Sequence, residues 1–256
     1  MAGTAAWELA HEAAGAAGVR LRPLDALEDA DEILRVMIAT WGEHQLVPRE
    51  MLVALAHSGN VPYGAVREDE IVGYVLGWAG VDGDGLHVHS HMLAVLPDRR
   101  HGGVGYALKL AQRAQALDQG IHVVRWTFDP MVARNAWFNL GKLGAVADRF
   151  SRDFYGQMGD LLNRGERSDR FVARWDLDRE PGPRAVEAIA VVEVPEDHAG
   201  LRERDPAAAR LRRDEVADAV ERQLELGRVA AAFDRERSAY LFVPAETLGA
   251  DRGVVR

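Results

Sequence analysis

The chain has 256 residues, no cysteine, a hydrophobic share of 48%, a charged share of 28% and a formal net charge of −9. This composition is typical of a globular protein, and the length allows one large domain or an ordinary domain with a smaller appendage. The acidic balance disfavours binding to a nucleic-acid backbone. The lack of cysteine excludes disulfides, thiolate catalysis and thiolate-ligated zinc.

Residues 1–18 are rich in alanine and carry Glu8 and Glu12 without a basic leader, so they predict a helix and not a signal peptide. No window approaches the roughly 18 uncharged apolar residues of a membrane span, and we expect a cytoplasmic protein without membrane contact. Alternation, helical periods and glycine stops then predict a strand at 19–24, helices at 29–41 and 48–59, and strands at 63–69, 70–81 and from about 86.

A helix at 106–117, a strand at 122–130, a helix at 132–146 and strands at 148–155 and 170–177 follow. Because a helix separates the strand near 86 from the strand at 122–130, these two strands are expected to run parallel. The sequence therefore predicts an α/β (mixed α+β) fold with a central mixed, mostly antiparallel sheet flanked by helices.

The Pro- and Gly-containing run at 178–184 reads as a linker. Beyond it the sequence predicts a strand at 188–195, a helix from an Asp205-Pro206 start to Gly227, and a hairpin. We assign an N-terminal helix to 1–18, the main domain to 19–180 and a small C-terminal α+β extension to 181–256.

The stretch "HVHSHMLAVLPDRRHGGVGYALKL" at 87–110 runs from a strand through a glycine cluster into a helix. Main-chain N–H groups at such a junction point at one spot, and the helix dipole reinforces them, which suits a phosphate. A Walker loop does not fit, because Lys109 comes a turn too late, and a dinucleotide fingerprint fails at Leu108. An anion cradle is favoured over a tight turn alone. Its residues are Arg100, His101, Gly102, Gly103, Val104, Gly105 and Tyr106.

The pattern Arg100-x-x-Gly103-x-Gly105 between a Leu-Ala-Val strand end and an amphipathic helix resembles the acyl-CoA-binding motif of the GNAT (Gcn5-related) N-acyltransferase superfamily. The order of elements over about residues 19–178 is also similar to that family. The resemblance implies that residues 100–106 hold the pyrophosphate of acetyl-CoA or another acyl-CoA. It implies that Leu93 and Val95 bind pantetheine and polarise the thioester carbonyl.

Three histidines alternate along the strand, so His87, His89 and His91 are expected to share one face. A three-histidine zinc site is one interpretation, and a solvent-facing strand edge is another, which we favour for His87. "HSHMLAV" is similar to the His-x-His-x-Leu-Ala-Val strand of arylalkylamine N-acetyltransferases. That resemblance implies that His89 or His91 takes the proton of the acceptor amine, and no metal is expected.

The sequence departs from the family pattern on the helix at 132–146. Leu140 stands where many members have a tyrosine that protonates the leaving thiolate, and Ala145 replaces a phenylalanine. Tyr155 is the candidate substitute, with a packing role as the alternative. The family's asparagine is also out of register: Asn135 or Asn139 would contact pantetheine, or would cap and solvate the helix.

The resemblance places the acceptor between the first inter-helix loop and the loop between the last two family strands. Arginine forks in the second loop suit a carboxylate, so an amino-acid-like acceptor is one prediction. Asp129 would orient the acceptor amine or form a turn before Pro130. The candidate acceptor residues are Trp41, Glu43 and His44 in the first loop, and Arg164, Ser168, Asp169 and Arg170 in the second.

Together these observations predict an acyl-CoA-dependent N-acyltransferase that moves an acetyl or succinyl-like group to the amine of a small molecule. Direct attack would be assisted by a histidine base and by main-chain donors near Leu93. The alternative is a non-catalytic CoA-binding or protein-interaction module with a degenerate site. No nucleic-acid partner is expected, and a homodimer is left open.

Overall fold

The structure is a computed structural model that describes residues 2–43, 46–100, 102–158 and 166–248. The fold is mixed α/β, with mostly antiparallel strands flanked by helices, as the sequence predicted. Two compact units divide the chain: the first extends to Arg125 and the second begins at Trp126. The domain assignment 19–180 stays a prediction, because a compact unit need not coincide with a family domain.

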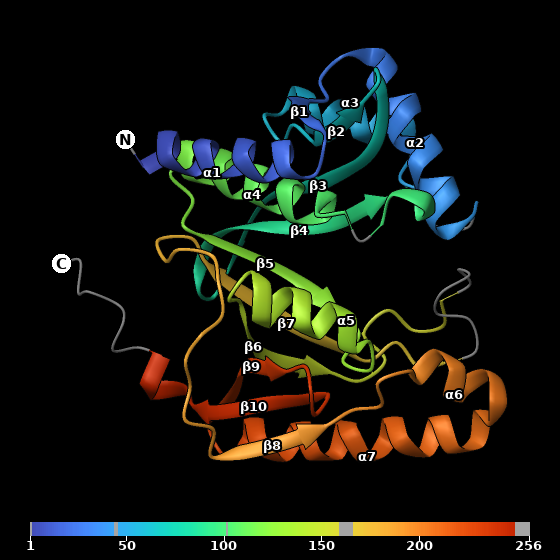
Figure 1. Cartoon of the computed structure of the whole chain (residues 1–256), viewed down its shortest axis with the longest axis vertical. Helices are drawn as coiled ribbons and strands as arrows, with labels where there is room; N and C mark the ends of the chain where they lie inside the picture. The colour runs from blue at the N-terminus through green and yellow to red at the C-terminus, as the bar shows by residue number, and fades with distance from the viewer. Residues whose placement is uncertain (1, 44–45, 101, 159–165, 249–256) are drawn as a thin grey trace. The chain divides into compact units, whose positions relative to one another are not determined.

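The elements of the first unit can be followed from the N-terminus in Figure 1. They are α1 (Ala2–Ala16), β1 (Arg20–Pro23), α2 (Leu27–Trp41), α3 (Arg49–His57), β2 (Tyr63–Arg67), β3 (Glu70–Asp82), β4 (Gly85–Val95), η1 (Pro97–Arg99), α4 (Val104–Asp118) and the first half of β5 (Val123–Phe128). Strands β1 to β4 are antiparallel neighbours, and β4 pairs with β5 in parallel, as the crossover through α4 predicts.

Helices cover both faces of this sheet. On one face, Ile33 of α2 and Leu76 of β3 belong to one buried cluster, which α3 also joins. On the other face, Ala14, Val75 and Leu108 belong to a second cluster under α1 and α4. Because α1 also packs on α4, helix α4 lies between apolar partners on two sides and is buried along most of its length. Among the described residues, no helix combines the length and apolar character that crossing a bilayer requires.

A β-bulge interrupts the pairing of β3 and β4. Leu76 pairs with Met92 and Gly77 pairs with Ser90, which leaves His91 as the extra residue on β4. A bulge reverses the face toward which the following side chains point. Ser90 accordingly faces α4, whereas Met92 packs against the core cluster on the α2 face.

The second unit contains the remaining elements. They are the end of β5, α5 (Ala133–Ala136), the π-helix η2 (Trp137–Lys142), β6 (Val146–Ser151), β7 (Arg170–Asp176), β8 (Ala190–Glu193), α6 (His198–Arg204), α7 (Pro206–Glu225), β9 (Arg228–Asp234), β10 (Ala239–Pro244) and η3 (Ala245–Leu248). The strand order is β7-β6-β9-β10-β8, with antiparallel neighbours throughout. The C-terminal segment therefore extends a sheet, through the pairing of Ala147 with Ala230.

Three expectations for this unit need correction. The helix expected at 132–146 has one α-helical turn followed by a π-helix, in which the ring of Trp137 lies against Gly141, where a Cβ would come within 2.3 Å of it. The strand expected at 148–155 lies at Val146–Ser151. Helix α6 was not predicted, although Asp197 caps its first turn by accepting a hydrogen bond from Gly200 N.

Candidate active site

The glycine turn lies between η1 and α4. Gly103 has φ = 86°, in the left-handed region that favours glycine, and it caps α4, whose first residue is Val104. The N–H groups of Val104 and Gly105 belong to the first helical turn, which has no carbonyl of its own helix for them. Such donors at a positive helix end can hold an anion. His101, expected here, lies outside the described residues.

The outer edge of β4 runs directly into this turn. Leu96 N donates to Val72 O at 2.9 Å, so by ladder alternation the main-chain groups of Leu93 and Val95 point away from β3. The β4–β5 pairs within the described residues are Val88–Val124 and His89–Arg125, ahead of these positions.

A Cβ at Gly105 would lie 3.7 Å from Leu93 Cδ2 and 3.9 Å from Val95 Cγ2, which brings the turn beside the strand. The guanidinium of Arg100 also returns to the strand, because its Nε donates to Val95 O at 3.3 Å. Strand edge and glycine turn thus form one continuous surface of main-chain donors and acceptors.

The imidazoles of His89 and His91 lie together with an indole that the sequence did not single out. Their ring centroids are 5.7 Å apart, and the Trp78 ring of β3 lies 5.1 Å from His89 and 4.9 Å from His91. Trp78 is paired with His89 in the ladder, and the bulge at His91 keeps the second imidazole within reach of the same indole. We call Trp78, His89 and His91 the imidazole–indole cluster.

The environment of the cluster keeps its imidazoles in the neutral form. Burial lowers the pKa of His89 to about 4, and repulsion from His91, His87 and Lys109 acts in the same direction. Partial burial also lowers the pKa of His91. Both imidazoles are therefore neutral near pH 7 and have a nitrogen lone pair available, which is the state that a general base requires.

The expectation of a solvent-facing His87 is wrong. Its side chain is only 9% exposed, its Nδ1 lies 3.2 Å from Gly85 O, and its ring fills the space beside Gly80, where a Cβ would lie 3.1 Å from Nε2. Glycine at position 80 thus leaves room for the ring. Within the described part of the chain, no group of three histidine, aspartate or glutamate side chains could hold a metal ion.

Lys109 was missed as a candidate residue. It is 2% exposed, and its Nζ donates to Ser90 Oγ at 3.0 Å and to Gln112 Oε1 at 2.9 Å. Burial lowers its pKa to about 7. Ser90 lies between the two histidines in sequence and faces α4, so a buried lysine with a readily lost proton lies on the α4 side of the histidine strand. The signal in the sequence was a lysine inside the mostly apolar stretch YALKLA at 106–111, near the start of α4.

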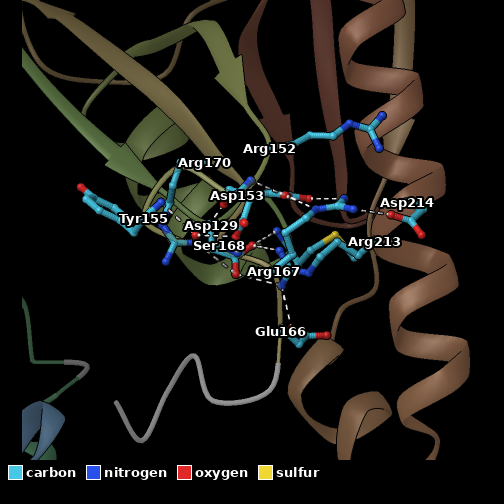
Figure 2. A network of polar contacts seen from close by, with 12 residues as sticks. Asp129, Arg152, Asp153, Tyr155, Glu166, Arg167, Ser168, Arg170, Arg213 and Asp214 are labelled. Atoms are coloured by element: carbon cyan, nitrogen blue, oxygen red, sulfur yellow. Dashed lines mark hydrogen bonds and ion pairs between the residues drawn. The ribbon is translucent and has the colours of Figure 1, made fainter. Parts of the chain in front are cut away.

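The predicted residues of the second unit lie in a dense polar network (Figure 2). Tyr155 is 43% exposed, and its hydroxyl is 2.9 Å from Thr127 Oγ1. The guanidinium of Arg170 lies 5.6 Å from the centre of the Tyr155 ring and is buried. Asp129 is engaged by Arg213 through both carboxylate oxygens, at 3.1 and 3.0 Å. Arg213 was not singled out from the sequence.

The other predicted residues differ in their burial and contacts. Asn139 is buried, and its Oδ1 accepts from Trp126 Nε1 at 3.2 Å, whereas Asn135 is half-buried. Trp41 packs at the edge of the cluster under α2. Ser168 and Asp169 are buried, whereas Glu43 is exposed. His44 and Arg164 lie outside the described residues.

Comparison with known proteins relates part of this chain to a family. A model of the Acetyltransferase (GNAT) family matches residues 26–141. No curated protein matches the chain. Naa20 of Chaetomium thermophilum, solved in complex with a bisubstrate analogue, is similar in fold, with a TM-score of 0.50 and 18% identity over 65% of this chain and 95% of its own.

The ribosomal-protein-S18-alanine N-acetyltransferase of Escherichia coli aligns with a TM-score of 0.49 and 14% identity over 67% of this chain and 99% of its own. At such identities a structural likeness concerns the fold alone. The family match is more specific, because residues 26–141 include the histidine strand and the glycine turn. Residues 26–141 of this chain therefore carry a GNAT acetyltransferase domain, and enzymes with this domain transfer acyl groups from coenzyme A.

Proposed function

We propose that the chain transfers an acetyl or succinyl-like group from acyl-CoA to the amine of a small molecule, with His89 or His91 as general base. The observation that carries this proposal is the imidazole–indole cluster: two neutral imidazoles lie on β4, whose outer edge leads into the glycine turn.

The donor half of the reaction rests on main-chain groups. The N–H groups at the start of α4 would hold the pyrophosphate, with Arg100 as a further cation at the turn. The N–H of Leu93, which points away from β3, would donate to the thioester oxygen and stabilise the negative charge that develops there. Val95 would bind the pantetheine arm through its main chain, and Asn135 would contact it from the helix.

The chemical step is direct attack. The acceptor arrives as an ammonium ion with a pKa near 10, and His89 or His91 takes its proton, directly or through water. The neutral amine attacks the thioester carbon, and the tetrahedral intermediate loses its second N–H proton to water. The C–S bond then breaks, which gives an amide and the thiolate of coenzyme A. We propose Tyr155 as the acid that protonates the thiolate. Since thiols ionise near pH 8.5, the leaving group is tolerable even with slow protonation.

For the acceptor we propose an amine with an aromatic or other apolar group. Trp78 supports this assignment, because its indole flanks both candidate bases and would pack against such a group or against an arriving ammonium. A carboxylate on the acceptor would call for an arginine, and Arg170 is the candidate. Asp129 is less suited to orient an amine than the sequence suggested, since Arg213 occupies its carboxylate.

The test is release of free thiol from acetyl-CoA and succinyl-CoA with phenylethylamine, L-phenylalanine and L-lysine. The first two amines differ by a carboxylate, so their ratio reports carboxylate recognition. His89→Ala/His91→Ala should abolish thiol release and leave CoA binding by calorimetry unchanged. Loss of both together would point to a structural role for the pair. Binding of CoA without thiol release from any pairing would favour the non-catalytic alternative.

A further inference from the structure

Helix α7 contacts the connection between β6 and β7 through three arginines. Figure 2 labels these arginines, Arg152, Arg167 and Arg213, together with Asp214 of α7. Residues 152–158 and 166–169 of this connection are described, and they carry Tyr155 and lead into Arg170. Neither the family match nor the proposed chemistry accounts for α7, because the match ends at residue 141.

The innermost of these contacts joins three elements. Arg213 of α7 donates to both oxygens of Asp129, and its Nη2 donates to Glu166 Oε2 at 2.7 Å. The side chains of Arg213 and Glu166 are 4% and 5% exposed. His198 of α6 reaches the same carboxylate, with Nε2 2.9 Å from Glu166 Oε1. Although burial alone raises it, the pKa of Glu166 is held at about 2 by His198 and Arg213, so the carboxylate stays charged at neutral pH.

Two further contacts come from one acidic stripe of α7. Asp214, Asp218 and Glu221 are spaced by four and three residues and therefore lie on one helical face. Arg152 donates to Asp218 at 2.5 Å and to Glu221 at 2.6 and 2.8 Å. Arg167 donates to Asp214 at 2.8 Å and also binds the fully buried Asp169. The connection is thus fixed at both of its described ends.

The contacts continue from there to the candidate acid. Ser168, next to Arg167, accepts a hydrogen bond from Tyr155 N at 2.9 Å and donates to Gly156 O at 2.8 Å. Ser168 O accepts from Phe154 N at 2.9 Å. The path from α7 to the Tyr155 backbone therefore passes through Arg167 and Ser168 without a gap.

We propose that α7 positions Tyr155 and Arg170 for the acceptor, so that Arg152, Arg167 and Arg213 are positioning residues of the acyl transfer. This inference rests on the proposed function, which assigns these two side chains to the thiolate and the acceptor. Loss of these ion pairs would change KM for the acceptor and leave KM for acetyl-CoA unchanged, because none of the three arginines belongs to the glycine turn or to β4.

The exposed pair offers the cleanest test, because Arg213 is buried and its replacement could prevent folding. Arg152→Glu places a like charge against Asp218 and Glu221, and Arg152→Glu/Asp218→Arg/Glu221→Arg restores attraction with the signs reversed. The matched control is Glu215→Ala, which removes the Arg212–Glu215 pair, an exposed ion pair of α7 that does not involve the connection. The readouts are hydrogen exchange of residues 152–158 and 166–169, and KM for the acceptor and for acetyl-CoA.

We expect Arg152→Glu to speed exchange in the connection and to raise KM for the better of phenylethylamine and L-phenylalanine about fivefold, with KM for acetyl-CoA unchanged. The triple variant should restore both values, and Glu215→Ala should match the wild type. Unchanged exchange in Arg152→Glu, failure of the triple variant to restore it, or an equal rise of both KM values would overturn the proposal. If the wild type releases no thiol, the proposed function fails, while the exchange measurement still decides whether α7 holds the connection.

Discussion

Replacement of the buried lysine tests how the core beneath the histidine strand is built. Lys109 is enclosed by α4 and β4, and burial lowers its pKa from 10.5 to about 7. Between these pH values the unfolded chain binds a proton that the folded chain lacks, so stability rises with pH by up to about 1.4 kcal/mol per pH unit. The contribution is fully present above the unfolded pKa and is lost as pH falls toward 7. Integration from pH 7 to pH 9 gives about 2 kcal/mol for this group.

Lys109→Met keeps the length of the side chain and removes the charge. At pH 7 the relief of desolvation is offset by Ser90 and Gln112, each of which loses a donor at about 1–3 kcal/mol if it stays unsatisfied. The net change at one pH is therefore small, and the slope between pH 7 and pH 9 is the informative quantity.

Urea unfolding at pH 7 and pH 9 measures this slope for the wild type, for Lys109→Met and for Lys142→Met. Lys142 is the chain's other lysine and is exposed, which makes it the matched control. We expect the pH dependence to be weaker by about 2 kcal/mol in Lys109→Met and unchanged in Lys142→Met. If the free energy of unfolding changes between pH 7 and pH 9 by the same amount in all three proteins, within about 0.5 kcal/mol, Lys109 is not desolvated in the folded chain.

Three further predictions follow from the same contacts. In an NMR titration, the imidazole signal that disappears in His89→Gln should have its midpoint near pH 4, because burial and three neighbouring imidazole or ammonium groups disfavour its charged form; a midpoint of 6 or higher would contradict this electrostatic account. Gly77→Ala should destabilise the fold by about 1–3 kcal/mol and reduce thiol release, because a Cβ at this position would lie 2.7 Å from the carbonyl oxygen of His89. A free energy of urea unfolding equal to that of the wild type would show that β4 can move away from the added Cβ without cost. Tyr240→Phe should cost about 1–2 kcal/mol in thermal unfolding, since the fully buried hydroxyl donates to Pro130 O at 2.8 Å, and no loss would mean that this carbonyl finds another donor.

The sequence predicted the local elements well where periodicity and turn residues agree. The crossover through α4 gave the parallel pairing of β4 and β5, and the Asp205-Pro206 start of α7 is confirmed by two hydrogen bonds to the Asp205 carboxylate. Periodicity failed at η2, because the same apolar stripe fits an α-helix and a π-helix. Leu140 is buried in either case.

The site residues named from the sequence stay predictions, and the environment of these residues could not be predicted. Regular alternation would continue the face of His89 and His91 through Leu93 and Val95, whereas the bulge at His91 turns Leu93 and Val95 toward the α4 side. A bulge has no reliable signature in a single sequence. Trp78 contacts the histidines because β3 pairs with β4, and the register of that pairing could not be predicted from the sequence. The ion pairs of Arg213 with Asp129 and Glu166 join residues more than forty positions apart in the sequence, and local sequence patterns cannot predict such contacts.

A crystal structure with bound acetyl-CoA tests the central claim most directly. The account predicts that the pyrophosphate lies against the N–H groups of Val104 and Gly105, and that the thioester oxygen accepts from Leu93 N. It also predicts that the thioester carbon lies near the imidazole–indole cluster, with room for an amine beside His89 or His91. A coenzyme bound away from the glycine turn, or a thioester on the far side of β4 from both imidazoles, would contradict the account.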